Sequence, residues 1–273
     1  MLVLLRQMKP AGQARNTTDA RSERILRALQ QSGSVMVEDL CSLLNVSIAT
    51  VRRDLQELED RGLLRRTHGG ATTVEPLLYE PFRHDSSFRD QIELHADEKR
   101  RIAMAAADLI EDGDTISLTA GTTTTEVVRG MRHRSGITVL TNTVNVAMEL
   151  SQRRDLDVIV TGGHLRGSWF SLVGPLAVQA LEQIFANKVF IGVNGIDAER
   201  GLTCHNPDEA ATNRVMVRQA KKRIAIADHS KLGVVATHRI CGIDLVDILI
   251  TDSDATDEAV APFLAQGIEV RRV

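Results

Sequence analysis

The sequence predicts a two-part α/β protein, in which a small helical head precedes a larger domain built on a largely parallel sheet. Two patterns predict it. Apolar residues recur at helical spacing within residues 35–60, and from Asp97 onward short β-branched runs alternate with helical segments. A chain of 273 residues is long enough for a head of about 60 residues and a domain of about 200.

We expect four segments along the chain. The first five residues are apolar, but Arg6 follows them. This order is the reverse of a signal peptide, and the run is too short to span a bilayer. We therefore expect a cytoplasmic protein without membrane contact. The predicted segments are a disordered arm at 1–18, the head at 19–73, a proline-containing linker at 74–96 and the larger domain at 97–273.

The charge balance excludes a chain coated for nucleic acid. The formal net charge is −3, yet residues 1–75 hold 11 Lys and Arg against 9 Asp and Glu, so the head is at +2 and the remainder at −5. Any contact with DNA must therefore be local to the head, and the acidic remainder opposes indiscriminate binding.

The three cysteines, Cys41, Cys204 and Cys241, predict neither a disulfide framework nor a zinc site, because their number is odd and their spacing wide. Cys204-His205 could form half of a metal site, but no second pair at ligand spacing accompanies it. We expect no metal and no cofactor.

Three helices are expected in the head. The first begins at Asp19, a capping residue, and runs to about Gln31 before Gly33. The next two are joined by a tight turn at 45–47, where Ser47 can cap the following helix. Apolar stripes predict the buried faces of these two helices: Met36, Leu40, Leu43 and Leu44 in one, and Ile48, Val51, Leu55 and Leu58 in the other.

The opposite face of the last helix carries small or hydroxyl side chains followed by arginines, a pattern suited to the DNA major groove. A two-strand basic wing follows at 63–71, with Gly69-Gly70 as its turn. An ordinary helical hairpin with a solvated face is the alternative, because Asp54, Glu57, Glu59 and Asp60 lie among the arginines. The candidate DNA-binding residues are Ser47, Ala49, Thr50, Arg52, Arg53, Gln56, Arg65, Arg66 and His68.

These residues resemble a known family. The segments at 22–26, 46–47, 50–55 and 68–71, together with Leu58, are similar to the N-terminal winged helix-turn-helix of the DeoR family of bacterial repressors. The resemblance implies operator binding, with the helix that begins near Ser47 as the recognition helix.

In the larger domain, a helix from Asp97 should bury Ile102, Ala106, Leu109 and Ile110. Strands are predicted at 115–118, 137–140, 156–160, 188–193, 223–227, 246–251 and 268–270. Ligands of such sheets bind at the carboxyl ends of the strands, so the loops there are the candidates for a site.

Those loops carry glycines, hydroxyls and charges suited to a small phosphorylated polyol. Gly121 followed by threonines can cradle an anion at a helix N-terminus, Arg166 or Lys231 can oppose a phosphate, and carboxylates can accept sugar hydroxyls. Helix caps and surface residues are the alternatives. The candidate ligand-binding residues are Thr119, Gly121, Thr122, Thr123, Thr124, Asn142, Gly162, Gly163, Arg166, Asp197, Glu209 and Lys231.

The same loops resemble the DeoR-family effector domain, at 117–123, 141–142, 161–163, 192–197, 201–203, 209–210 and 228–231. The resemblance implies an α/β fold similar to ribose-5-phosphate isomerases and CoA transferases, and a sugar-phosphate effector. We expect the variable segment 164–172, with Trp169-Phe170, to set effector identity, with a contribution from 206–208.

The leading hypothesis is a repressor of a carbohydrate catabolism operon, not an enzyme, relieved by a phosphorylated sugar and assembled as a dimer or tetramer that pairs two heads on operator DNA. One alternative is a sugar-phosphate isomerase with an appended DNA-binding head, using Asp197 or Glu209 with Lys231. It is weakened because fold alone does not carry function and the isomerases' acidic motif is missing here. The other alternative is an activator or nucleoid-type DNA-binding protein with a vestigial sensor.

Overall fold

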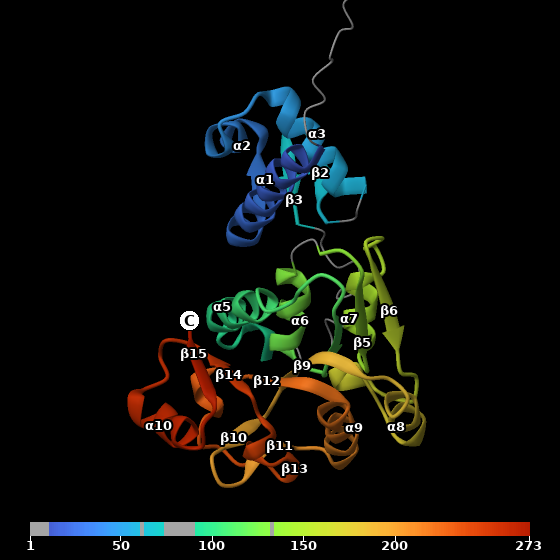
Figure 1. Ribbon diagram of the computed structural model, residues 1–273, viewed down its shortest axis with the longest axis vertical. Coiled ribbons are helices and arrows are strands. Elements are labelled where there is room, and N and C mark those ends of the chain that lie inside the picture. Colours follow the sequence, from blue (N-terminus) through green and yellow to red (C-terminus); the bar gives the residue numbers. More distant parts are fainter. Residues whose placement is uncertain (1–10, 61–62, 74–90, 132–133) are drawn as a thin grey trace, which may run out of the picture. The chain divides into compact units, whose positions relative to one another are not determined.

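The protein forms two compact units, one from residues 1–75 and one from residues 76–273. Figure 1 shows their elements in the computed structural model. The residues that the structure describes are 11–60, 63–73, 91–131 and 134–273.

The first unit is a three-helix head with a small antiparallel sheet. Its strands pair in the order β1-β3-β2, so the predicted two-strand wing gains a third strand. A core of Ile25, Leu40, Val51, Leu55 and Leu58 joins the helices. The elements are α1 (Ala11–Ser32), β1 (Ser34–Met36), α2 (Val37–Leu44), α3 (Ile48–Asp60), β2 (Arg65–Thr67) and β3 (Gly70–Thr72).

The head corrects the expected arm. Helix α1 begins at Ala11, so residues 11–18 are helical and not disordered. The segment lacks an apolar stripe, which is why no helix was predicted there. A helix already nucleated at 19–32 extends backward at little cost until a breaker, because each added residue gains a hydrogen bond. Read backward from Asp19, the first proline in the sequence is Pro10.

Three residues of the predicted apolar stripes lie on the surface: Met36, Leu43 and Ile48 are 50%, 45% and 48% exposed. Met36 belongs to strand β1. Helix α2 begins at the next residue, Val37, and buries Val37, Leu40 and Leu44. Leu43 is outside that stripe, and Ile48 is the first residue of α3.

The second unit is built on a seven-stranded sheet whose order is β15-β14-β12-β9-β4-β5-β6. Each neighbouring pair is parallel, as the sequence predicted. The ends of the seven predicted strands shift by three residues at most. The strands are β4 (Thr115–Leu118), β5 (Ile137–Thr141), β6 (Leu156–Val160), β9 (Ala186–Gly192), β12 (Ala220–Ile226), β14 (Ile248–Thr251) and β15 (Glu269–Arg272).

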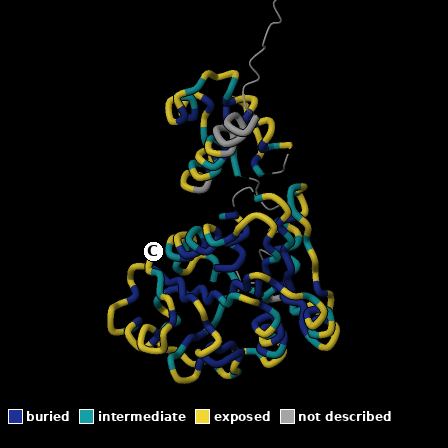
Figure 2. The backbone as a smooth tube through the Cα atoms, viewed as in Figure 1, coloured by how far each residue is buried: buried dark blue, intermediate teal, exposed yellow. Residues whose placement is uncertain are grey.

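The central strands of the sheet are buried on both faces because alternate side chains enter two separate cores, whereas the edge strands β6 and β15 are half-buried or exposed. Phe190, Ile224 and Ile248 pack against one set of helices, whereas Ile191 and Leu249 pack on the opposite side. Figure 2 shows the central strands as a buried layer between more exposed helices. The helices are α5 (Ala96–Ala107), α6 (Thr122–Gly130), α7 (Val144–Leu150), α8 (Pro175–Leu181), α9 (Pro207–Arg218) and α10 (Asp257–Ala265).

The sequence did not predict the short antiparallel elements of this unit. Strands β7 and β8 form a hairpin, and β10, β11 and β13 form a three-stranded sheet. Each contains only three or four residues, too few for an alternating pattern to stand out. They are β7 (His164–Arg166), β8 (Ser171–Val173), β10 (Gly195–Asp197), β11 (Gly201–Cys204) and β13 (His238–Cys241), with 3-10 turns at Gly167–Trp169, His229–Lys231 and Ile243–Leu245.

Of the predicted linker, residues 74–90 lie outside the described residues. Its last part belongs to the second unit by contact, because Lys99 of α5 donates hydrogen bonds to the carbonyls of Gln91 and Leu94. None of the helices in the described ranges is long and apolar enough to cross a bilayer.

An ion pair between half-buried Arg21 and buried Asp54 fixes α1 against α3. Arg21 Nε and Nη2 donate to the two carboxylate oxygens of Asp54 at 2.8 and 3.0 Å, and Asp54 is 3% exposed. Arg21→Ala leaves this carboxylate buried without its bidentate partner. We expect it to lower the free energy of unfolding of the head by about 2 kcal/mol.

Urea denaturation of the full chain can locate this loss. Trp169, the single tryptophan, lies in the second unit, so its fluorescence follows that unit, whereas circular dichroism follows the helices of both. Arg21→Ala should shift only the dichroism transition. The control Arg27→Ala, at an exposed position on α1, should shift neither. If the fluorescence and dichroism transitions of Arg21→Ala are the same as those of the wild type, the pair does not stabilise the head.

Candidate functional site

The N-terminus of α3 is capped as the sequence predicted. Ser47 Oγ accepts from the Thr50 N–H at 3.3 Å, and the two hydroxyls are 3.0 Å apart. Asn45, in the left-handed conformation at φ 54°, ends α2 and turns the chain toward Ser47. The cap therefore fixes where the exposed face of α3 begins.

That face presents the predicted DNA-binding residues to solvent. Ala49, Arg52, Arg53 and Gln56 are exposed, and Thr50 is half-buried. Val51, Leu55 and Leu58 occupy the opposite side of α3 in the core. A helix with an apolar inner stripe and small, hydroxyl and guanidinium side chains outside has the composition of a major-groove reading helix.

The strand β2 is held against α3 by Arg66. Its backbone N–H donates to Glu59 Oε1 at 2.8 Å, and its guanidinium donates to Gln56 Oε1. Gln56 in turn donates to Asp60 at 2.9 Å. Two predicted DNA contacts, Gln56 and Arg66, are therefore engaged within the head, whereas Arg65 and His68 are exposed on the wing.

These contacts also explain why the acidic residues do not cancel the arginines. Asp54 is buried against Arg21, and Glu59 and Asp60 contact Arg66 and Gln56. The carboxylates of Asp54, Glu59 and Asp60 are thereby directed toward internal partners. The exposed guanidiniums of Arg52 and Arg53 remain available for DNA.

The second unit contains a cavity of about 180 Å³ at the carboxyl ends of strands β4, β9 and β12. This is the edge where the sequence predicted a ligand site. Its walls come from α5, α6, α9, the β7–β8 hairpin and the turn 229–231. Six of the predicted residues line it: Gly121, Thr122, Thr123, Arg166, Glu209 and Lys231.

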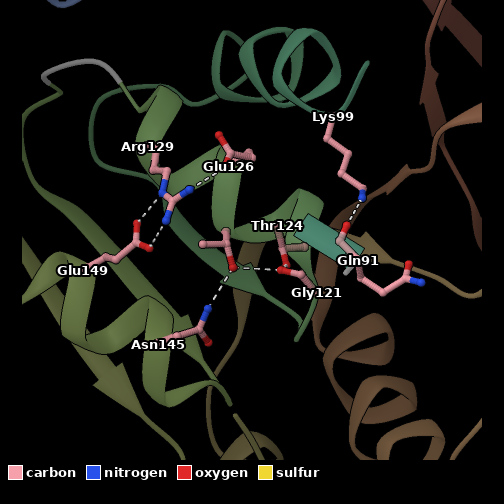
Figure 3. Close-up of polar contacts among 9 residues, drawn as sticks. Gln91, Lys99, Gly121, Thr124, Glu126, Arg129, Asn145 and Glu149 are labelled. Atoms are coloured by element: carbon pink, nitrogen blue, oxygen red, sulfur yellow. Dashed lines mark hydrogen bonds and ion pairs between the residues drawn. The ribbon is translucent and has the colours of Figure 1, made fainter. Parts of the chain in front are cut away.

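Two lysines give the cavity a cationic region. Lys99 is 4% exposed, and Nζ donates to the backbone carbonyls of Gln91 and Leu94. Figure 3 shows Lys99 reaching from α5 toward Gln91 near Gly121. Neither Lys99 nor Lys231 forms an ion pair with a carboxylate in the described part of the chain, whereas Lys188 of the same unit pairs with Asp114 at 2.6 Å.

The charge on Lys99 is held in an unfavourable position. Burial lowers the pKa of its ammonium below the ordinary value, and the charge of Lys231 lowers it further, while Asp228 opposes the shift. The cavity therefore holds two cations near one another, with one of them poorly solvated. An anion there would stabilise both.

The N-terminus of α6 supplies further anion donors. Gly121 is its N-cap, and the N–H groups of the first turn, including Thr122 and Thr123, lack intrahelical acceptors. The helix is anchored from behind: Thr125 Oγ1 donates to the Gly121 carbonyl at 2.8 Å and accepts from Asn145, and Arg129 pairs with Glu149 (Figure 3). These donors are thus held in place at the cavity.

A different part of the cavity is polar without excess positive charge. Glu209, in the first turn of α9, accepts from Arg166 at 3.1 Å and from the Ser171 hydroxyl at 2.9 Å through one oxygen. Asn206 caps α9 by accepting from the Asp208 and Glu209 N–H groups. Arg166 is therefore already ion-paired, which weakens its predicted role as the phosphate partner.

The structure places six predicted ligand residues outside the cavity lining. Thr119 bridges β4 to β9 by accepting from the Gly192 N–H at 3.0 Å, and Thr124 donates to the Gly121 carbonyl. Asn142 donates to the Leu172 carbonyl at 3.2 Å, and Asp197 accepts from the N–H groups of a tight turn. Gly162 and Gly163 turn the chain at positive φ into the β7–β8 hairpin.

Sequence reasoning missed several lining residues, above all Lys99 and Asn213. Lys99 belongs to the charged run 97–101 and looked like part of a solvated helix surface. Asn213 lies four residues after Glu209, a spacing that places both on the same face of α9. That spacing was the feature of the sequence from which Asn213 could have been identified as a lining residue. Trp169 lines the cavity from the segment expected to set effector identity, and Asn206 from the other.

One group of potential metal ligands occurs among the described residues, formed by His229, Asp252 and Asp254. Asp252 is buried, and its oxygens accept from the His229 N–H, from His229 Nδ1 and from the Asp254 N–H at 2.7–3.1 Å. These bonds offset the effect of burial and hold the pKa of Asp252 below its ordinary value. The group clamps two loops, and Cys204-His205 takes no part in it.

Both units match models of one family. The DeoR-like helix-turn-helix domain matches residues 21–76, and the DeoR C terminal sensor domain matches residues 94–253. The chain is 37% identical to a putative aga operon transcriptional repressor of Escherichia coli O157:H7 over 263 residues, 95% of this chain and 96% of that protein. It is 36% identical to the transcriptional repressor GlcR of Bacillus subtilis, over 84% of this chain and 86% of the relative.

The matches among solved structures are more distant. A D-ribose-5-phosphate isomerase in complex with phospho-erythronic acid has a TM-score of 0.37 at 17% identity, covering 50% of this chain and 53% of that one. The full-length sorbitol operon regulator SorC from Klebsiella pneumoniae has a TM-score of 0.39 at 12% identity, covering 89% and 99%.

A helix-turn-helix head followed by a sensor domain defines a DNA-binding transcriptional regulator. The chain belongs to the DeoR family. The relatives are named as regulators and repressors, which confirms the predicted regulator and does not favour the isomerase alternative.

Arg53 provides the test of the reading face. Arg53→Ala should weaken binding to promoter DNA of the regulated genes by about 10- to 100-fold, because one guanidinium contact to a base edge or phosphate is lost. Mobility-shift titration at fixed salt measures this. Because Arg53 is exposed, the urea transitions should not change. Undiminished affinity for specific DNA would remove Arg53 from the interface.

Proposed function

We propose that this protein represses a carbohydrate catabolism operon and releases its DNA when a small phosphorylated sugar occupies the cavity of the second unit. The observation that carries the proposal is the pair Lys99 and Lys231, two cations that line one cavity and have no carboxylate partner in the described residues. The repressor direction is supported by the relatives, several of which are named repressors.

The chemistry of the cavity favours a phosphate dianion at the lysines. A phosphate presents several acceptor oxygens, which can be shared between the ammonium groups and the free N–H groups at the start of α6. Helix dipole and lysine charges act in the same direction there. The acidic total charge of the second unit makes this local cationic region more selective for a bound anion than for nucleic acid.

The rest of the cavity favours a small polyol. Its volume of about 180 Å³ lies below the roughly 300–1,000 Å³ typical of pockets for drug-sized ligands. Glu209, Asn206 and Asn213 supply carboxylate and amide groups that suit hydroxyls, and Trp169 offers an apolar ring surface. A short phosphorylated sugar carries both kinds of group on one molecule.

For the effector to act as a switch, it must bind one arrangement of the protein more tightly than another. A single head makes few phosphate contacts, and pairing two heads on adjacent half-sites doubles them. We therefore include a homo-oligomer, dimer or tetramer, in the proposal. Effector binding would then change how well paired heads match their half-sites.

The direct test is thermal stabilisation of the purified protein by a panel of phosphorylated and free sugars and polyols, followed by DNA retention with each stabilising compound. Selective stabilisation by a phosphorylated compound that also releases DNA supports the proposal. Equal stabilisation by the free sugar contradicts the proposal. A panel in which no compound stabilises the protein contradicts it as well. DNA release with no requirement for phosphate would move the effector to another chemical class.

The two lysines should separate effector binding from folding. Lys99→Met and Lys231→Ala should each weaken binding of the stabilising sugar phosphate at least tenfold, as measured by calorimetry, because a charge opposite the phosphate is lost. Lys99→Met removes a buried charge, but it also removes the donor of the Gln91 and Leu94 carbonyls, so its unfolding temperature is measured together with its affinity to show that the variant is folded.

The matched control is Lys221→Ala, an exposed lysine of β12 away from the cavity. It should leave both affinity and unfolding temperature unchanged. Wild-type affinity in both cavity variants would show that the phosphate binds elsewhere.

Lys99 also predicts a pH dependence of effector affinity. In the free protein its pKa is lowered by burial, and a bound phosphate would raise that pKa again. Above the lowered pKa the free protein has lost this proton, so binding would have to take the proton up again. Affinity should therefore fall as the pH rises through the lowered pKa. As the pH rises from the lowered pKa toward the ordinary lysine pKa, affinity should decline more steeply for the wild type than for Lys99→Met. Equal slopes would show that Lys99 does not titrate with binding.

A further inference from the structure

Residues 91–95, which we call the linker end, are attached to one of the two cationic elements of the cavity by hydrogen bonds. The linker end precedes α5, and the chain leads from it through residues 74–90 to the head. Lys99 Nζ donates to the carbonyls of Gln91 and Leu94, and Figure 3 shows Lys99 reaching from α5 to Gln91. Lys99 also lines the cavity. One side chain therefore joins the cavity to the chain that leads to the head.

The last residue of the linker end contacts the other cationic element. The ring of His95 packs edge-to-face against the ring of His229, with centroids 4.9 Å apart and planes at 80°. His229 begins the turn 229–231, in which Lys231 lines the cavity. The His229 ring is held in place because its Nδ1 donates to buried Asp252 at 2.8 Å. The linker end is thus attached to both of the elements that carry the cavity lysines.

The backbone of His95 shows that the linker end is held against its own preference. His95 lies in the left-handed region at φ 54° and ψ 42°, directly before the first residue of α5. Residues other than glycine are uncommon in this region, and they persist there where the surrounding structure holds them. Here the His95 carbonyl accepts from the Lys99 N–H at 3.0 Å, and the ring rests on His229. The order of the linker end should therefore depend on these contacts.

Lys99 can bind an anion without releasing the linker end. An ammonium group has three N–H donors, and two carbonyls of the described residues accept from this one. A phosphate oxygen can accept from the third. Burial lowers the pKa of Lys99, whereas hydrogen bonds from a charged donor are stronger than those from a neutral one. An anion that keeps Lys99 charged therefore strengthens its bonds to Gln91 and Leu94.

We propose that the linker end couples the cavity to the head: a phosphorylated sugar that contacts Lys99 and Lys231 tightens the attachment of residues 91–95, and this tightening changes how strongly paired heads bind DNA. The inference rests on the proposed function and assigns the path by which the effector acts on the head. Two heads on adjacent half-sites are linked modules, so their joint affinity depends on the length and stiffness of the chain that connects them. An ordered linker end shortens the part of that chain which is free to move. Effector and DNA are then coupled through the order of one segment.

Hydrogen exchange of the full-length wild type tests the tightening directly. Exchange of the amides of residues 91–99 is followed by mass spectrometry, without ligand and with saturating D-glucose 6-phosphate, D-galactose 6-phosphate, D-fructose 1-phosphate or D-fructose 6-phosphate. We expect the compound that binds most tightly in calorimetry to slow this exchange by about fivefold or more, because opening of the linker end then breaks stronger contacts. Exchange in α10, which does not line the cavity, should not change.

His95→Asn tests whether the linker end carries the coupling. Asparagine tolerates the left-handed conformation, but it lacks the ring that rests on His229, and both lysines remain. Effector affinity should stay within about threefold of the wild type, whereas the ratio of promoter DNA affinities without and with effector should fall by about threefold or more. The control His238→Asn makes the same change at a half-buried histidine of β13 that does not line the cavity, and it should alter neither quantity. A purely structural His95 would lower the unfolding temperature when replaced and leave the ratio unchanged.

Failure of this inference is distinguishable from failure of the proposed function. If a sugar phosphate binds and releases DNA while exchange of residues 91–99 is unchanged or faster, the linker end does not carry the signal, although the sensor remains. A full wild-type ratio in folded His95→Asn overturns the inference as well. If no sugar phosphate binds, the proposed function fails and the inference fails with it. The exchange measurement needs no substitution, so it decides the question should His95→Asn not fold.

Discussion

Burial of the parallel sheet on both faces is the constraint on which the second unit depends. The central parallel strands have helices on either side and few exposed side chains, so polar chemistry is concentrated at the strand ends. The carboxyl ends of β4, β9 and β12 lie next to one another in the sheet, and their loops meet there. The cavity follows from this arrangement, because segments from 91 to 231 are brought together at a single edge.

In the head, internal pairing of charges has a comparable role. Its surplus of positive charge is small, and a count of charges would predict weak attraction to DNA. The structure directs Asp54, Glu59 and Asp60 toward Arg21, Arg66 and Gln56, and leaves the arginines at the front of α3 exposed. What matters for DNA is the local distribution of charge and not its sum, since screening limits each charge to its neighbourhood.

The sequence predicted the fold well because periodicity is a local signal. Each of the seven sheet strands was found from a short β-branched run, and Ser47 was identified as the cap of α3 from residue type alone. Strand β1 and the β7–β8 hairpin were missed, because three residues show no periodicity. Residues 11–18 were misjudged since a helix can extend without an apolar stripe.

The site was predicted only in part, for a different reason. Motif residues in a loop can bind a ligand or hold the loop, and the sequence does not separate the two roles. Thr119 and Asn142 hold strands and hairpins together, whereas Thr122 and Thr123 line the cavity. Lys99 was missed because burial of a lysine depends on tertiary packing, and within its charged run it resembles any solvated helix residue.

Lys99 and Lys231 show why the cavity suits an anion. Burial lowers the pKa of the Lys99 ammonium, and neither lysine pairs with a carboxylate among the described residues. Under the proposed function, the phosphate of a sugar would satisfy both charges at once. The two lysines lie on α5 and in the turn 229–231, which contribute to separate walls of the cavity. An effector bound to both would favour the arrangements that keep those walls at one distance, and this preference would be the differential affinity that a switch requires.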